Sequence, residues 1–250
     1  IDHLWSYEQI LQHYYSNTTS SYAADREIKV HITRNNEMDL LVTSVMPFSV
    51  EGIQFYGNQI ARISANGPHS FNIHQSNGCA DPGYPVWSAH PGRLDGSGRT
   101  YVEVKPLYPD SSINDLNQLL QLITCDRSNA SSEVSRRHYR GSLGLIEQNG
   151  QYTFNRVLRE QYLRGVVPQE TPSSWGIMGG GTGMQALRAQ AIAARTYLEA
   201  ISQRRQAKGY MTDTCDTIGC QVYLGASANG QPLDYGPDFW TTTAAVTDTA

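Results

Sequence analysis

The chain has 250 residues and a net charge of −4, and charged residues make up only 17% of it. This length allows one large domain or two small ones, each with a buried core. The mild negative charge argues against a nucleic-acid partner, because binding to phosphate groups needs a basic face. No apolar run approaches the ~18 residues needed to cross a membrane, so we expect no transmembrane segment in this chain.

Four cysteines, Cys79, Cys125, Cys215 and Cys220, fit two disulfide bonds formed in an oxidising compartment. We expect the pairs Cys79–Cys125 and Cys215–Cys220, for which chain entropy predicts about 4 and about 2 kcal/mol of stabilisation. The spacing of Cys215 and Cys220 also allows half of a zinc site, and free thiols are a third alternative. Zinc needs four ligands and no second Cys/His pair lies nearby, so we expect no metal and no cofactor.

The N-terminal residues 5–15 predict a short amphipathic helix. Ser6 is suited to cap its first turn, and Ile10, Leu11 and Tyr14 share one face. We expect this face to dock onto the core.

An alternating pattern follows the helix. Ile28, Val30 and Ile32 point one way with polar residues between them, which is typical of a half-buried strand. Residues 39–45 form a second apolar run, and Asn35-Asn36 is the expected turn between the two strands.

The long region 46–136 is rich in Gly, Pro, Ser and Asn, with short apolar pieces at 52–56 and 101–104. This composition predicts several short strands joined by loops. Residues 115–124 carry leucines at mostly helical spacing, which predicts one short helix. Residues 126–137 are polar and are expected to form a linker or exposed loop.

Two strands and a long helix are predicted next. Residues 139–145 and 151–157 read as a hairpin, because Asn149-Gly150 is a strong turn signal. Residues 184–203 predict a helix with many alanines, which allow close packing against a neighbour. Its narrow apolar face consists of Leu187, Ala191, Ala194 and Leu198.

One carboxylate, Glu170, stands between these elements. Residues 158–166 predict a short helix whose buried stripe is Leu158, Tyr162 and Val166. Pro168 and Pro172 flank Glu170, and proline disfavours helix in the residue before it, so we expect Glu170 in a stiff, irregular segment. The glycine-rich residues 173–183 lack a phosphate-loop ending and predict a flexible loop over the cleft.

A solitary carboxylate limits the chemistry. Glycosidases of the usual kind need two carboxylates, one on each side of the sugar. A lytic transglycosylase needs one, which first protonates the glycosidic oxygen and then takes a proton from the C6 hydroxyl of the sugar. Such an acid works best with its pKa raised above about 4.3 by partial desolvation. The apolar neighbours expected to supply this desolvation are Val166, Val167 and Trp175. A nearby helix N-terminus would instead lower the pKa of the acid.

Three stretches carry a family resemblance. Residues 162–175 read Tyr-Leu-Arg-Gly-Val-Val-Pro-Gln-Glu-Thr-Pro-Ser-Ser-Trp, residues 185–197 read Gln-Ala-Leu-Arg-Ala-Gln-Ala-Ile-Ala-Ala-Arg-Thr-Tyr, and residues 215–225 read Cys-Asp-Thr-Ile-Gly-Cys-Gln-Val-Tyr-Leu-Gly. Together they resemble the SpoIID/LytB family, enzymes that cleave bacterial cell-wall glycan. The resemblance covers about residues 137–225 and implies that Glu170 is the catalytic acid.

The resemblance also implies residues that bind the glycan. The matching positions are Arg188, where a lysine is more usual, and Gln190, Arg195, Tyr197, Gln221 and Tyr223. Each has a structural alternative. Arg195 pairs in that case with a carboxylate such as Asp216, and the tyrosines belong to the core.

The expected fold class is α+β, with a SpoIID-like core of helices packed on β-rich segments. We expect residues 1–45 to supply an N-terminal helix and strands, 46–136 a β-rich insertion or second subdomain, and 137–250 the catalytic core. The chain ends before the Ser-Ser-Gly-Gly-type and Gly-His-Gly-type motifs of the family, so we expect that core to be C-terminally incomplete. A cleft between helices and strands is expected to hold Glu170 at its floor.

The expected function is a secreted or envelope-attached bacterial lytic transglycosylase. It would cleave the MurNAc–GlcNAc bond of peptidoglycan to a 1,6-anhydro end, and the resemblance implies a preference for strands stripped of stem peptides. Two alternatives remain open. One is a non-catalytic glycan-binding protein that enhances a cell-wall amidase, and the other is a structural envelope domain with a vestigial cleft.

Overall fold

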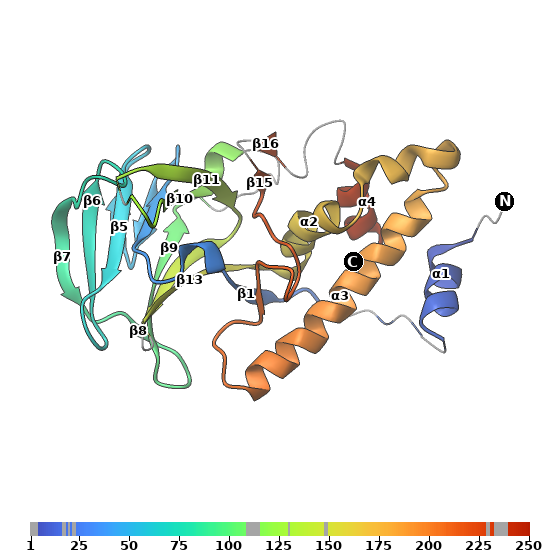
Figure 1. The fold of residues 1–250 in the computed structure, drawn as a ribbon, viewed down its shortest axis with the longest axis horizontal. Helices are drawn as coiled ribbons and strands as arrows, with labels where there is room; N and C mark the ends of the chain where they lie inside the picture. Colours follow the sequence, from blue (N-terminus) through green and yellow to red (C-terminus); the bar gives the residue numbers. More distant parts are fainter. Residues whose placement is uncertain are drawn as a thin grey trace.

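The computed structural model describes the chain except residues 1–4, 17–18, 20, 22–23, 109–115, 130, 148–149, 229–230 and 233–239. The fold is α+β, as predicted from the sequence. Figure 1 shows an elongated molecule with most of the strands at one end and helices α1 and α3 at the other. Among the described residues, no helix combines the length and the apolar character that crossing a membrane requires.

The first sheet contains strands from both halves of the chain. Its order is β14-β1-β13-β12-β9-β3-β4, and β8 pairs with β9. All neighbours are antiparallel except β1 and β14, which run parallel. The strands are β1 (Glu27–His31), β3 (Phe48–Val50), β4 (Ile53–Phe55), β8 (Arg93–Leu94), β9 (Thr100–Pro106), β12 (Ser142–Glu147), β13 (Gln151–Leu158) and β14 (Thr214–Cys215).

The second sheet is antiparallel, with the order β11-β10-β2-β5-β6-β7. Its strands are β2 (Leu40–Thr43), β5 (Ile60–Ala65), β6 (Phe71–Ser76), β7 (Tyr84–His90), β10 (Leu120–Cys125) and β11 (Glu133–Tyr139), and a separate ribbon pairs β15 (Ser227–Ala228) with β16 (Gln231–Pro232). Region 46–136 is rich in strands, as expected. Those strands enter both sheets and pair with strands from outside the region, so they do not form a sheet of their own.

The helices gather around one long member. They are α1 (Tyr7–Tyr14), α2 (Arg159–Glu170), α3 (Met184–Ala207) and α4 (Trp240–Asp248), with 3₁₀ turns η1 (Thr33–Asn35), η2 (Leu116–Gln118) and η3 (Ser173–Gly181). The predicted N-terminal helix is confirmed. Ser6 Oγ accepts a hydrogen bond from the Gln9 amide, and Gln9 Oε1 accepts one from the Ser6 amide, which completes a capping box.

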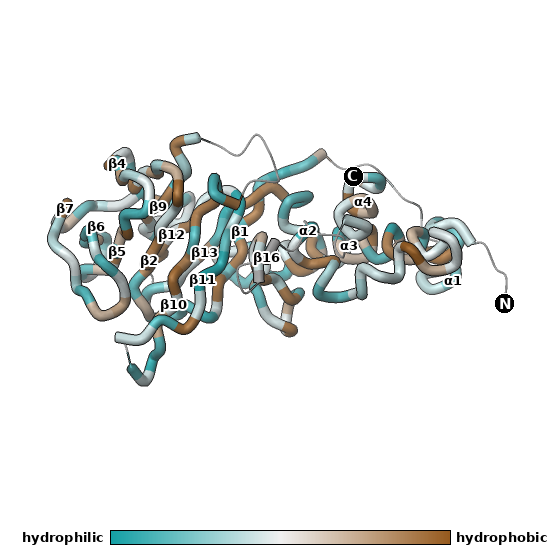
Figure 2. Tube along the Cα trace, turned by 90° about the horizontal axis from the view of Figure 1, so that it is seen from above, coloured by the Kyte–Doolittle hydropathy of each residue, from teal (hydrophilic) through white to brown (hydrophobic). Residues whose placement is uncertain are grey.

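The main apolar core joins both sheets to helices α2, α3 and α4, and a smaller cluster lies within the second sheet. It includes Ile28 from β1, Val42 from β2, Val166 from α2 and Leu198 from α3. The four residues of the predicted α3 face are all buried, so that prediction is confirmed. Figure 2 shows the hydrophobic residues concentrated on the inner strands of the sheets. The helices and the sheets therefore stabilise each other through one buried interior.

Two sequence predictions in the second sheet are wrong. Residues 115–124 do not form a helix, because η2 is followed by strand β10, which pairs with β2 on one side and β11 on the other. A central strand buried on both faces needs apolar residues at successive positions, and this requirement also produces a helix-like leucine spacing. Residues 126–137 are only partly a loop. Strand β11 begins at Glu133, and its polar, largely exposed edge-strand residues resemble a loop in sequence.

The two predicted turns have different outcomes. Asn35 lies in η1, but the strands that flank it belong to different sheets, so the turn is a corner between sheets. The buried Asn35 side chain fixes this corner by donating to the Asp39 carbonyl and to Thr153 Oγ1. The second turn joins β12 to β13, which pair as the predicted hairpin with Glu147 opposite Gln151. Asn149 lies outside the described residues.

The structure joins the two expected cysteine pairs. Cys79 is bonded to Cys125, which ties the connection before β7 to β10, and Cys215 is bonded to Cys220. Both sulfurs of the second pair are engaged in this bond, so they are not zinc ligands in this structure. Within the described part of the chain, no cluster of three His, Cys, Asp or Glu side chains is arranged to hold a metal ion.

Candidate functional site

Helix α2 carries Glu170 as its last residue. The expected irregular segment is wrong, because the helix continues through Pro168 and ends when Thr171 adopts an extended conformation before Pro172. Tyr162 and Val166 are buried as predicted, but Leu158 precedes the helix and is 40% exposed. The tertiary packing of α2 therefore overcomes the cost of an internal proline, about 3 kcal/mol.

Gly165 lets α2 lie directly against the segment that follows Cys220. A Cβ atom at this position would stand 2.5 Å from the Gly225 carbonyl oxygen and 2.7 Å from the ring of Tyr223. Any larger residue would push the helix away from this segment. Two of the stretches that carry the family resemblance, residues 162–175 and 215–225, are thus packed against each other.

Tyr223 anchors the same segment to the sheet. It is fully buried, and its hydroxyl donates to Asn155 Oδ1 on β13 at 2.8 Å. The Asn155 amide in turn donates to the carbonyls of Arg140 and Ser142 at the start of β12. Tyr223 is therefore a core residue that supports the site, which is the structural alternative given for the tyrosines, and it does not face an open surface.

A groove of about 380 Å³ lies between α3 and the segment after β14. Its described lining consists of Tyr15, Glu170, Gln190, Ala193, Ala194, Tyr197, Ile218, Cys220, Gln221 and Val222. Four of the residues predicted for the site therefore meet here, although they come from three separate segments. Gln190 and Tyr197 are seven residues apart on α3, which places them on one face of the helix.

Glu170 is held in the groove by the backbone. The Val222 amide donates a hydrogen bond to Glu170 Oε1 at 3.2 Å. Glu170 is the only carboxylate among the described residues that line the groove. Its side chain is exposed, so it lies on a wall of the groove and not at the floor of a cleft. Val166 and Val167, which were expected to desolvate it, face the core.

Gln221 connects the floor of the groove to the helices. Burial raises the pKa of Tyr162, so its hydroxyl remains protonated and donates to Gln221 Oε1 at 3.3 Å. Gln221 Nε2 donates to the Ala194 carbonyl on α3 at 3.2 Å. These two bonds fix the side-chain amide and hold the segment that carries Val222 against both helices.

Neighbouring elements do not take the expected positions. The groove contacts the middle of α3, so the N-terminus of that helix does not point at Glu170. Residues 173–183, expected as a flexible loop over the cleft, form η3 and a turn that pack against α3 and α4. None of them lines the groove. Trp175 is 44% exposed there and does not desolvate Glu170.

The comparison with protein families covers this site. Residues 147–250 match the family model SpoIID, described as Stage II sporulation protein. Residues 147–250, about two fifths of the chain, are therefore similar to a SpoIID domain. No curated protein and no solved structure matches the chain. The matched region contains Glu170, the groove-lining part of α3 and the segment after Cys220, and a SpoIID domain indicates a function related to sporulation and the cell wall.

The two predicted arginines lie away from the groove. Arg195 donates from Nε and Nη2 to the two carboxylate oxygens of Glu160 on α2, at 2.9 and 2.6 Å. Arg188 donates to Asp248 on α4. The pair of Arg195 with Asp216 does not form, because Asp216 instead accepts from the amide and hydroxyl of Thr33.

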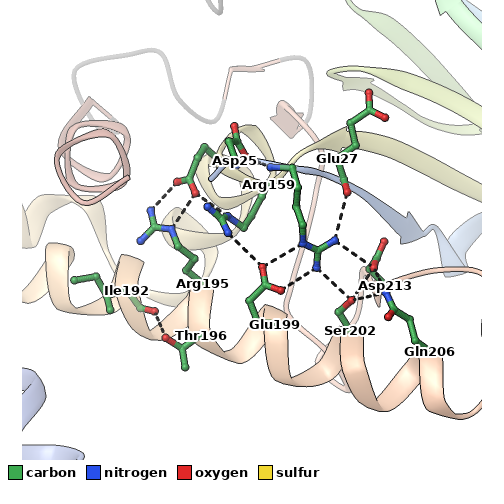
Figure 3. Close-up of polar contacts among 12 residues, drawn as sticks. Asp25, Glu27, Arg159, Ile192, Arg195, Thr196, Glu199, Ser202, Gln206 and Asp213 are labelled. Atoms are coloured by element: carbon green, nitrogen blue, oxygen red, sulfur yellow. Dashed lines mark hydrogen bonds and ion pairs between the residues drawn. The ribbon is translucent and has the colours of Figure 1, made fainter. Parts of the chain in front are cut away.

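A network of ion pairs surrounds Arg195 (Figure 3). Arg159 bridges Glu160 and Glu199, and Glu199 also accepts from Arg26 just before β1. Burial opposes ionisation of Glu160 and Glu199, but the hydrogen bonds and charges of their arginine partners outweigh it and lower the pKa of both carboxyl groups. These arginines hold α2, α3 and β1 together, which is a structural role.

Apart from Ala193 and Ala194 of α3, three residues of the groove were not predicted as site residues from the sequence. Tyr15 follows α1, far in the chain from the matched residues 147–250, and Ile218 is 92% exposed inside the second disulfide loop. Val222 contributes its backbone amide, which no side-chain pattern reveals. No sequence signal distinguishes these positions, because only the packing of α1, α3 and the disulfide loop brings them together.

Proposed function

We propose that this chain is a lytic transglycosylase that cleaves the MurNAc–GlcNAc bond of peptidoglycan, with Glu170 as its acid and base. The observation that carries the proposal is the solitary carboxylate. Among the described residues of the groove, Glu170 is the only carboxylic acid, and the Val222 amide orients it. A hydrolase with two carboxylates would need a second one about 5–9.5 Å away, across the sugar.

The reaction needs no other proton carrier. Protonated Glu170 gives its proton to the glycosidic oxygen, and the bond from that oxygen to C1 of MurNAc breaks. The resulting carboxylate takes the proton of the C6 hydroxyl on the same MurNAc, and O6 bonds to C1. The products are a 1,6-anhydro end and a free GlcNAc 4-hydroxyl, and Glu170 is protonated again.

The other polar side chains of the groove suit a sugar ligand. Gln190 and the half-exposed Tyr197 offer amide and hydroxyl groups to hydroxyl or N-acetyl groups of the glycan, and the Tyr15 ring supplies an apolar surface. Two disulfides together with a SpoIID domain support an extracytoplasmic, bacterial location at the cell wall. The preference for peptide-stripped strands follows from the family resemblance.

A second function is supported by the exposure of Glu170. The groove is open to solvent, whereas a catalytic site usually excludes water from the reacting bond. A glycan-binding protein that enhances a cell-wall amidase would use the same groove without cleaving the strand.

Digestion of purified peptidoglycan, with and without prior amidase treatment, separates the two functions. Mass spectrometry is expected to detect anhydro-ended products from the parent chain and none from Glu170→Gln. Glu27→Gln is the matched control, because its side chain is 64% exposed and does not line the groove. Anhydro products from Glu170→Gln would assign the acid elsewhere. Glycan binding without products from any variant would favour the binding protein.

A further inference from the structure

A second pocket, of about 460 Å³, lies at the C-terminal end of α3. Its described lining consists of His31, Ile146, Tyr152, Arg205, Lys208, Gly209, Tyr210, Met211 and Thr212. Two of these residues are cationic and none is acidic, although the whole chain has a net charge of −4. A cationic pocket in an acidic protein favours an anionic ligand.

Arg205 is fixed in this pocket without a carboxylate partner. Its Nε donates to the Thr212 carbonyl at 3.0 Å and its Nη2 to Thr212 Oγ1 at 2.6 Å, while the guanidinium lies 4.4 Å from the ring centre of Tyr210. Neither Arg205 nor Lys208 forms an ion pair with a described residue. Burial lowers the pKa of Arg205, which reflects a charge that is partly removed from water. Asp213, which follows Thr212 and pairs with Arg26, acts on this charge without forming an ion pair with it, so the positive charge is oriented and only partly offset.

Stabilisation of the helix end does not account for this arrangement. Basic residues in the last turn of a helix often bind its free carbonyls or offset its dipole. Here the backbone already closes α3, because the Gly209 amide donates to the Gln206 carbonyl and the Tyr210 amide to the Arg205 carbonyl. Gly209 has the positive φ that this Schellman motif requires. The Arg205 side chain points instead to Thr212, outside the helix.

The rest of the pocket wall is aromatic and neutral. The rings of His31 and Tyr152 meet edge to face, with their centres 5.7 Å apart. Burial lowers the pKa of His31, so its imidazole is neutral at pH 7 and the positive charge of the pocket comes from Arg205 and Lys208. Aromatic rings beside cationic groups suit a ligand that has both an apolar ring face and an oxyanion.

The pocket lies on the same side of α3 as the groove that holds Glu170. Arg205 and Lys208 follow Ala194 and Tyr197 at a spacing of about three helical turns, which returns to the same face about 16 Å along the helix. The segment from Thr212 to Val222 runs from one site to the other, because its ends line the pocket and the groove respectively. An oligosaccharide can span this distance.

We propose that this pocket binds the carboxylate of an acidic sugar, as carried by a muramic acid residue whose stem peptide has been removed. A phosphate-bearing saccharide polymer offers the same oxyanion chemistry from another source. The choice of muramic acid rests on the proposed function, but binding itself requires no cleavage and no contribution from Glu170.

Nuclear magnetic resonance titration of the full chain tests the proposal with three probes: N-acetylmuramic acid, N-acetylglucosamine and inorganic phosphate. N-acetylmuramic acid is expected to shift the Gly209 and Tyr210 amide signals and to bind at least about tenfold more tightly than the uncharged sugar, because a charge-assisted hydrogen bond is lost with the latter. Glu170→Gln is expected to bind equally well, whatever its effect on cleavage.

Matched variants locate the charge that matters. Arg205→Gln and Lys208→Gln are expected to weaken binding at least about tenfold. Arg204→Gln removes the same charge from an exposed neighbour outside the pocket and is expected to change affinity little. The Lys208 side chain makes no hydrogen bond to a described residue, so Lys208→Gln is expected to keep the fold. It therefore tests the proposal even where Arg205→Gln fails to fold.

Each outcome decides between the ligands. Tight binding of phosphate at the same amides, with weak binding of N-acetylmuramic acid, would keep the oxyanion pocket and replace its ligand by a phosphate polymer. Equal binding of the acidic and the uncharged sugar, or equal loss in Arg204→Gln and Lys208→Gln, would overturn the proposal. Failure of all three probes to shift the Gly209 and Tyr210 signals would also overturn it.

Discussion

Two faces of helix α3 carry polar residues, and the structure uses them differently. Toward the groove, Gln190 and Tyr197 form no side-chain hydrogen bond with the described residues. On the face toward α2 and β1, Arg195 and Glu199 are engaged in ion pairs. The two sets are interleaved within one helix, so polarity does not separate binding residues from structural ones. The partner of each polar side chain decides whether it is structural, and such partners, for example Glu160, come from distant parts of the chain.

The largest expected difference between the two faces is in stability. Arg195→Ala breaks a pair whose side chains are only 13% and 12% exposed, and we expect it to lower the free energy of unfolding by about 3 kcal/mol. Gln190→Ala on the groove face is expected to change it by less than about 0.5 kcal/mol. Urea denaturation followed by circular dichroism measures both, and similar values for the two variants would remove the distinction.

A smaller effect is expected for two tyrosine hydroxyls. Tyr223→Phe leaves the buried Asn155 Oδ1 without its donor and is expected to lower the free energy of unfolding by about 1–2 kcal/mol. Tyr197→Phe is expected to leave stability unchanged and to weaken glycan binding, because this residue is half-exposed and lines the groove. Thermal unfolding and a glycan-binding assay on both variants test the contrast. The reverse pattern would place Tyr223 in the binding site.

The smallest effect is expected on the pH dependence of stability. Glu160 and Glu199 have lowered pKa values, so around pH 4 the unfolded chain binds more protons at these groups than the folded chain does. Their contribution is present above the ordinary carboxyl pKa of about 4.3 and is lost as the pH falls through the folded-state values. Glu160→Gln should flatten the decline in unfolding free energy between about pH 5 and pH 3. A parallel curve for parent and variant would contradict this.

Much of the fold was predictable because its signals are local. The capping box at Ser6, the hairpin between β12 and β13, and the apolar face of α3 each depend on neighbouring residues. The error at β10 arose because pairing on both sides overrides the spacing of its leucines. The joining of β1 to strands from the second half of the chain was not predictable, because no local pattern specifies which strands become neighbours.

The candidate site was predictable only in part. Glu170, Gln190, Tyr197 and Gln221 line one groove, yet Arg195 and Tyr223 were indistinguishable from them in sequence. A burial pattern does not reveal that an arginine finds a carboxylate on another helix. The continuation of α2 through Pro168 was also missed, because the packing permitted by Gly165 is a tertiary effect.

The position of β1 between β13 and β14 has a consequence for how the protein is made. Translation delivers β1 early, but both of its neighbours belong to the second half of the chain. Pairings between such distant segments form slowly, so the first sheet closes late. The groove is assembled at the same late stage, because all of its described lining except Tyr15 follows β13 in the chain. A polypeptide truncated before Thr214 would leave one edge of β1 unpaired and prone to association with other chains.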